Sequence, residues 1–120
     1  MIRQVADSFK CAIEGVKEGW NKERNFRIHC VFAVATIFLA FILQISIVKW
    51  VLLLITIGIV MSLELLNSGL ERAVDLVTND YHPIAKQAKD FAAASVFIFS
   101  LIAVIIGILL FAEPIIKFVS

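Results

Sequence analysis

The sequence offers few of the residues and motifs that define several common classes of binding site. Its two cysteines, Cys11 and Cys30, lack the C-x-x-C spacing of a zinc or redox site, so neither a disulfide nor a zinc site is indicated. The formal net charge is only +1, and the basic residues form no cluster of the kind that binds nucleic acid. No G-x-x-x-x-G-K-[ST] segment is present, so any nucleotide must be held without a P-loop.

Apolar residues, by contrast, are abundant. They make up 61% of the 120 residues, and the mean hydropathy is +0.95, whereas soluble proteins are about half apolar. Three apolar runs, residues 28–45, 50–70 and 91–112, are each long enough to cross roughly 30 Å of hydrocarbon. The sequence therefore predicts an all-α integral membrane protein with a single domain covering residues 1–120.

The segment before the first span has the pattern of an amphipathic helix. Over residues 2–20, apolar side chains recur on one face and charged side chains on the other, which predicts a helix lying in the membrane interface. Basic residues are concentrated in this segment and in the connection at residues 72–90, so the positive-inside rule places the N-terminus and that connection in the cytoplasm. Pro83, within the connection, is expected in the first turn of the next helix.

A stripe of polar side chains follows one face of the second span. Glu64, Asn67, Glu71 and Asp75 are spaced by i+3, i+4 and i+4, which places them within a narrow arc of a helix. Glu64 lies inside the span, and Glu71 lies about 10 Å further along the axis, near water. An acid at lipid depth costs roughly 3 kcal/mol on insertion scales, so it usually faces protein and serves a function. A structural hydrogen bond is the competing interpretation for Glu64, and a solvated helix end is an equally favoured one for Asp75.

The acidic and basic residues on the cytoplasmic side fit phosphoryl transfer. That reaction needs carboxylates that hold Mg²⁺, a lysine that meets the phosphates and an aligned acceptor hydroxyl. Glu23 and Glu71 suit magnesium, which favours one or two carboxylates together with substrate phosphates and water. Glu64 is placed to act as general base on a lipid hydroxyl. Lys89 and Asp90 supply the remaining residue types, although a solvated charge pair at a helix start is the simpler interpretation of these two alone.

Three groups of residues resemble the prokaryotic diacylglycerol kinase family over essentially the whole chain. They are Glu23 with Asn25, Phe26 and His29; Glu64-Leu65-Leu66-Asn67-Ser68 with Glu71 and Asp75; and His82-Pro83 with Ala85-Lys86 and Ala88-Lys89-Asp90. The resemblance implies a homotrimer whose active sites lie between subunits, with a surface helix and three spans in each subunit. It also implies roles by position: Glu23 and Glu71 bind Mg²⁺ and ATP, Glu64 is the catalytic base, Asn67 and Asp75 support the site, Lys89 and Asp90 contact the nucleotide, and Asp80, Tyr81 and His82 lie near it.

Within that family, residues 23–29 resemble the Gram-positive branch, whose members phosphorylate undecaprenol. The sequence is thus expected to encode an undecaprenol kinase of the bacterial cell membrane. A diacylglycerol kinase with the same mechanism is the nearest alternative. A small oligomeric transporter or channel, in which Glu64 binds a proton or cation, explains that residue but gives the cytoplasmic acids no role. A purely structural scaffold explains the carboxylate stripe least well.

Overall fold

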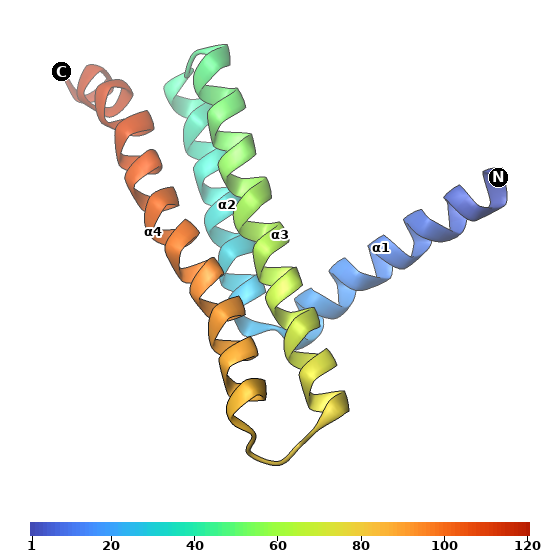
Figure 1. The fold of residues 1–120 in the computed structure, drawn as a ribbon. Helices are drawn as coiled ribbons and strands as arrows, with labels where there is room; N and C mark the ends of the chain where they lie inside the picture. Colours follow the sequence, from blue (N-terminus) through green and yellow to red (C-terminus); the bar gives the residue numbers. More distant parts are fainter.

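The computed structural model describes all 120 residues and contains four α-helices and no strand (Figure 1). The helices are α1 (Ile2–Lys22), α2 (Arg24–Leu43), α3 (Ile47–Val77) and α4 (Pro83–Val119). The last three are each long and apolar enough to cross a membrane. The prediction of an all-helical protein with an N-terminal helix and three helices able to span a membrane is confirmed.

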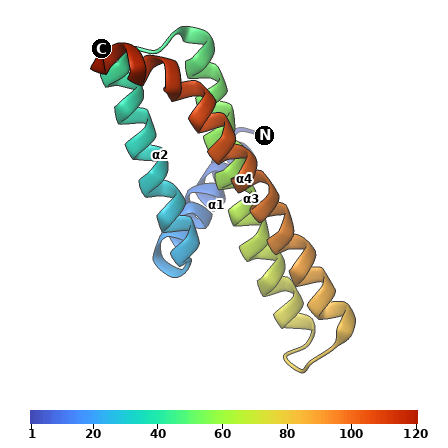
Figure 2. The ribbon, with the colours of Figure 1, turned by 90° about the vertical axis from the view of Figure 1, so that its left-hand side faces the viewer.

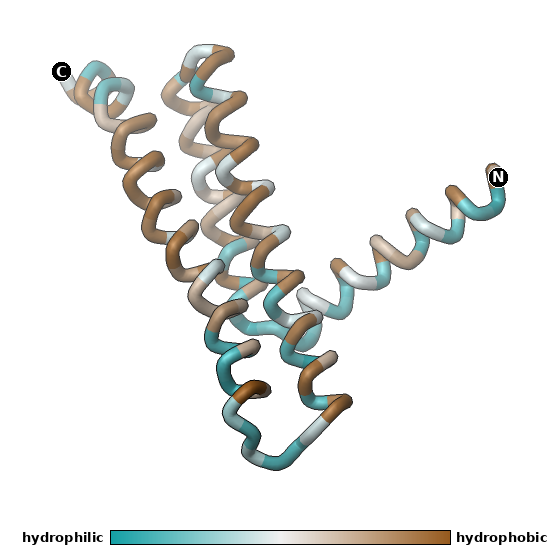
Figure 3. Tube along the Cα trace, in the orientation of Figure 1, coloured by the Kyte–Doolittle hydropathy of each residue, from teal (hydrophilic) through white to brown (hydrophobic).

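The helices α3 and α4 are longer than the apolar runs from which the spans were predicted. Their backbone hydrogen bonding continues through the polar segment, so only residues 78–82 separate the two helices. The resulting hairpin extends beyond the junction of α1 and α2 (Figures 1 and 2). Figure 3 shows that the apolar band covers the opposite part of the bundle and that polar residues gather at the hairpin end. The spans therefore continue into a helical projection that carries polar residues away from the apolar band.

Local sequence signals explain where the helices begin and end. Ser46 caps α3, since its side chain accepts a hydrogen bond from the Lys49 backbone N–H at 3.3 Å. Gln44 ends α2 in the left-handed conformation, at φ 50°. Pro83 lies in the first turn of α4, as predicted, and His82 Nδ1 accepts a hydrogen bond from the backbone N–H of Ile84 at 3.1 Å.

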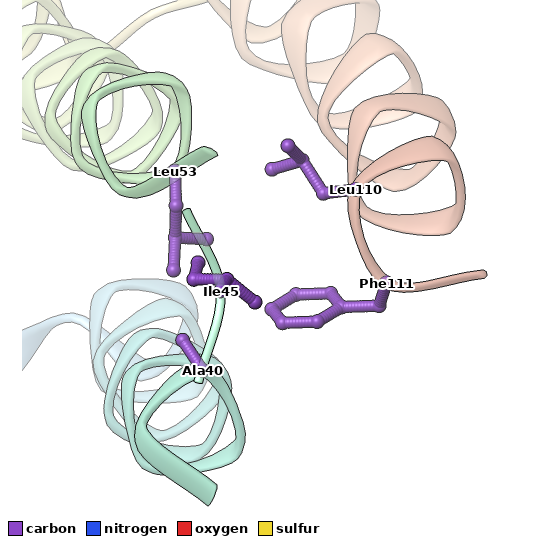
Figure 4. Close-up of a cluster of buried hydrophobic side chains, with 5 residues drawn as sticks. All are labelled: Ala40, Ile45, Leu53, Leu110 and Phe111. Atoms are coloured by element: carbon purple, nitrogen blue, oxygen red, sulfur yellow. The ribbon is translucent and has the colours of Figure 1, made fainter. Parts of the chain in front are cut away.

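A small apolar core holds the three spanning helices together near the α2–α3 turn. Only 11 of the 120 residues are buried, so one chain leaves most of its apolar surface for lipid or protein to cover. On α4, Pro114 lies inside the helix near this core, and the last turns of the ribbon bend away from the helix axis there (Figures 1 and 2). The five buried core residues come from α2, the turn, α3 and α4 (Figure 4): Ala40, Ile45, Leu53, Leu110 and Phe111.

The helix α1 leaves the bundle at a steep angle and contacts it only near its C-terminal end (Figure 1). Gly19 makes this contact possible, because a Cβ there would lie 2.8 Å from Leu65 Cδ2 and 3.2 Å from Phe26 Cδ1. Arg27 closes the junction by donating to the Trp20 carbonyl oxygen at 2.8 Å. The close approach fixes the end of α1 against α3 at the residue that follows Glu64.

Candidate functional site

The centre of the candidate site is Glu64, the buried carboxylate of α3. Its side chain is only 3% exposed, although it lies on a helix whose other faces are largely open. Its Oε2 lies 3.6 Å from Nε2 of His29, which α2 contributes. His29 belongs to the motif at residues 23–29, but no role for it was predictable from the sequence, because nothing in the α2 pattern shows that its side chain meets the stripe on α3.

Asn67 and Ser68 continue the buried polar surface along α3. The Oδ1 atom of Asn67 is inaccessible and has no hydrogen-bond partner, and Ser68 is buried as well. Buried carbonyl oxygens are normally hydrogen-bonded, and an unpaired one is costly. Asn67 therefore has a buried carbonyl oxygen without a partner, three residues after Glu64 on α3.

Glu23 and Glu71 approach the same region from different segments. Glu23 occupies the single residue between α1 and α2, in extended conformation, and its Oε1 accepts a hydrogen bond from Arg72 Nη2 at 2.8 Å. This ion pair joins residues 49 positions apart in the sequence. Glu71 is half-buried on α3. Glu71 lies about two helical turns from Glu64 on α3, and Glu23 reaches α3 through its ion pair with Arg72, the residue after Glu71.

The polar residues of the α3–α4 hairpin form a second group. Lys89 Nζ lies 2.5 Å from Asp75 Oδ1, and Lys86 Nζ lies 2.6 Å from Asp90 Oδ2. Asp75 thus pairs with a residue of α4. The remaining predicted nucleotide-binding residues, Asp80, Tyr81 and His82, are exposed in and beside the turn at the tip of the hairpin. In this single chain, Lys89 pairs with Asp75 and not with Glu23 or Glu71, and Asp90 pairs with Lys86.

One further acid of α1 is already paired with a lysine. The Lys22 ammonium donates to Glu18 at 2.8 Å, and this hydrogen bond and charge hold the pKa of the Glu18 carboxyl below its ordinary value. The Glu18 side chain is exposed. It is therefore a surface charge and is not counted among the site residues.

The donor set is compatible with a divalent cation that arrives together with a phosphate ligand. No three His, Cys, Asp or Glu side chains are close enough to form a complete metal site. Magnesium does not require one, because it is usually bound by one or two carboxylates plus phosphate oxygens and water. Glu23 already binds a cationic group, the Arg72 guanidinium, and Glu71 provides a second carboxylate, so the residues present fit this ion.

The chain is similar in sequence to known proteins of one family. Residues 10–111 match the sequence profile of the family described as prokaryotic diacylglycerol kinase. The undecaprenol kinase of Bacillus subtilis is 44% identical over 110 residues, which cover 92% of this chain and 89% of that protein. A Synechocystis diacylglycerol kinase is 42% identical over 92% of this chain and 63% of its own length. A Haemophilus influenzae diacylglycerol kinase is 36% identical over 92% of this chain and 95% of its own.

Residues 10–111 include the C-terminal part of α1, all of α2 and α3 with the polar stripe, and most of α4, and the relatives are lipid kinases by name. Nothing among them supports an ion transporter. The membrane-spanning helices, the buried carboxylate on α3 and the sequence matches lead to one conclusion: the chain belongs to the prokaryotic diacylglycerol kinase family and is a membrane lipid kinase.

Proposed function

We propose that this protein transfers the γ-phosphate of ATP to the hydroxyl group of undecaprenol at the cytoplasmic face of a bacterial inner membrane. The observation that carries the proposal is the burial of Glu64 beside His29 within a spanning helix. A carboxylate in that position can contact the hydroxyl group of a lipid. Bulk water has poor access to the same position. The similarity to the Bacillus subtilis undecaprenol kinase supports the choice of acceptor.

In the proposed reaction Glu64 is the general base. Its carboxylate takes the proton of the acceptor hydroxyl as the hydroxyl oxygen forms a bond to the γ-phosphorus of ATP. The bond between that phosphorus and the bridging β-phosphate oxygen breaks, and ADP leaves. Positioned base catalysis of this kind contributes typically about 100-fold to 10,000-fold in rate. The remainder of the catalysis is positioning and charge neutralisation.

Glu23 and Glu71 are the proposed magnesium ligands. When bound, the ion neutralises the charge that develops on the phosphate oxygens. Asn67 supports the site through its unpaired carbonyl oxygen. On the hairpin, Lys89 and Asp90 contact the nucleotide, with Asp80, Tyr81 and His82 close to it, and the ion pair between Asp75 and Lys89 orients the lysine.

The proposed assembly is a homotrimer with active sites between subunits. Large apolar side chains on α2, α3 and α4 remain exposed in the single chain, including Phe38, Leu54 and Phe97. Within one chain Lys89 pairs with Asp75 and forms no ion pair with Glu23 or Glu71. Sites that combine residues of two subunits account for both observations.

Diacylglycerol is the second candidate acceptor. The Synechocystis relative, at 42% identity, is named a diacylglycerol kinase, and the proposed base and metal ligands serve either lipid alcohol.

The proposed orientation of the protein in the membrane is supported by the basic residues near the N-terminus and on the hairpin, which favour the cytoplasmic side.

The experiment that tests this function measures ATP consumption by the purified protein in liposomes with and without a lipid acceptor. We expect consumption to require magnesium and a lipid alcohol together. Undecaprenol and diacylglycerol are supplied separately, and liposomes without either lipid are the control. ATP consumption that is absent, or that does not respond to either lipid, contradicts the proposal.

A further inference from the structure

His29 is the only ionisable side chain of α2 that the structure places against Glu64. Its Nε2 lies 3.6 Å from Glu64 Oε2, and the imidazole is 25% exposed, whereas the carboxylate is 3% exposed. The separation is longer than a hydrogen bond, so the contact is electrostatic in this state. Catalytic contacts are often long before the substrate binds and tighten in the complex.

The other charged groups around Glu64 cannot replace His29. A buried carboxylate is costly unless a group of opposite charge or a hydrogen-bond donor faces it. Glu23 and Glu71, the other acids of the candidate site, carry charge of the same sign when ionised and cannot do so. Arg72 is engaged with Glu23, and Lys89 with Asp75. His29 is thus the one available partner that can compensate the buried carboxylate.

The surroundings of His29 leave its imidazole free to act. It lines a cavity of about 340 Å³ between α2, α3 and α4 and is the only ionisable group in the lining. The hydroxyl groups of Thr36 and Thr56, which also line the cavity, donate to carbonyl oxygens of their own helices at 2.9 and 2.7 Å. The imidazole makes no hydrogen bond within the protein, so no competing partner holds it away from Glu64.

We propose that His29 is a positioning residue for Glu64, an inference that rests on the proposed function. The imidazole holds the Oε2 side of the carboxylate from α2, and this leaves Oε1 to accept the proton of the lipid hydroxyl. To position Glu64, residue 29 needs a polar group that faces Glu64 from α2. It does not need to contact the nucleotide. Removing the imidazole therefore slows the proton-transfer step and leaves the affinity for Mg-ATP unchanged.

The first test replaces His29 with leucine, which keeps much of the volume beside the cavity, and with glutamine, which keeps a donor. We expect His29→Leu to lower kcat roughly tenfold with little change in nucleotide affinity, and His29→Gln to retain most of the activity. Thr36→Val is the matched control, since it lies on the same helix and lines the same cavity without contacting Glu64. A kcat for His29→Leu equal to that of the wild type overturns the inference.

A double-mutant cycle with Glu64→Gln separates positioning from a structural role. If His29 acts through Glu64, adding His29→Leu to Glu64→Gln causes little further loss of turnover, because the carboxylate that it positions is already gone. The proposal is overturned if the loss of turnover in the double variant equals the product of the losses in the two single variants. Single-turnover transfer of labelled phosphate gives the sensitivity needed for these slow variants, and circular dichroism with size-exclusion chromatography verifies that they fold.

The outcome for the wild type keeps this inference distinct from the proposed function. If the wild type transfers no phosphate to either lipid, the proposed function has failed and this inference falls with it. If the wild type is active and the two substitutions multiply independently, the inference about His29 alone is overturned.

Discussion

Replacing Glu64 with glutamine is expected to lower turnover with undecaprenol by a factor on the order of 100 or more, while Mg-ATP affinity stays close to the wild-type value. Glutamine preserves the shape of the buried side chain but cannot accept the proton of the lipid hydroxyl. Steady-state kinetics in liposomes give the turnover, and equilibrium binding of a nucleotide analogue gives the affinity. The pairing of lost turnover with retained binding is what separates a general base from a metal ligand.

Glu113→Gln is the matched control for this variant. Glu113 lies near the far end of α4, is exposed and pairs with Lys117 at 2.8 Å. The same chemical change there should leave turnover unaltered, because exposed ion pairs contribute little to stability and this one is remote from Glu64. If Glu64→Gln turns over as fast as Glu113→Gln, the buried carboxylate is structural and the proposed mechanism is wrong.

Replacing Glu71 with glutamine is expected to weaken Mg-ATP binding roughly tenfold or more and to reduce activity in proportion at low nucleotide concentration. The amide removes one of the two carboxylates proposed to hold magnesium, and Glu23 remains paired with Arg72. The measurement is the nucleotide dissociation constant as a function of magnesium concentration. Glu14→Gln, on the exposed polar face of α1, is the control. Unchanged affinity in a folded Glu71→Gln protein argues against this residue as a ligand.

The same two variants also examine the proposed assembly. At low nucleotide concentration, both Glu64→Gln and Glu71→Gln are expected to have reduced activity by themselves, but mixed oligomers of the two should regain part of the lost activity if one site takes these residues from different subunits. Tandem purification with two affinity tags isolates the mixed species. Activity no higher than that of the separate variants, in oligomers shown to be mixed, points to sites built within one subunit.

The fold follows from the sequence because hydropathy and helical periodicity are local properties. The apolar runs fix the number of spans, and the amphipathic pattern of residues 2–20 identifies α1. The helix ends were less predictable, since α3 and α4 continue into polar residues that hydrogen-bond as helices outside the apolar band. Pro83 was placed correctly because a proline early in a helix has a local cause.

The stripe on α3 was predictable for the same reason, whereas its partners were not. Glu64 and Asn67 share a face by their spacing alone. The contact of Glu64 with His29, and that of Glu23 with Arg72, depend on how α2 and the α1–α2 junction pack on α3, which the close approach at Gly19 helps to set. No periodicity within one helix encodes which residue of another helix it will meet.

Competition between acceptors in one bilayer tests the proposal that this protein phosphorylates undecaprenol. Liposomes containing equal amounts of undecaprenol and diacylglycerol receive the purified protein, magnesium and ATP labelled in the γ-phosphate, and the lipid products are separated. We expect most of the label to be recovered in undecaprenyl phosphate. Label found mainly in phosphatidic acid, or in neither lipid, contradicts it.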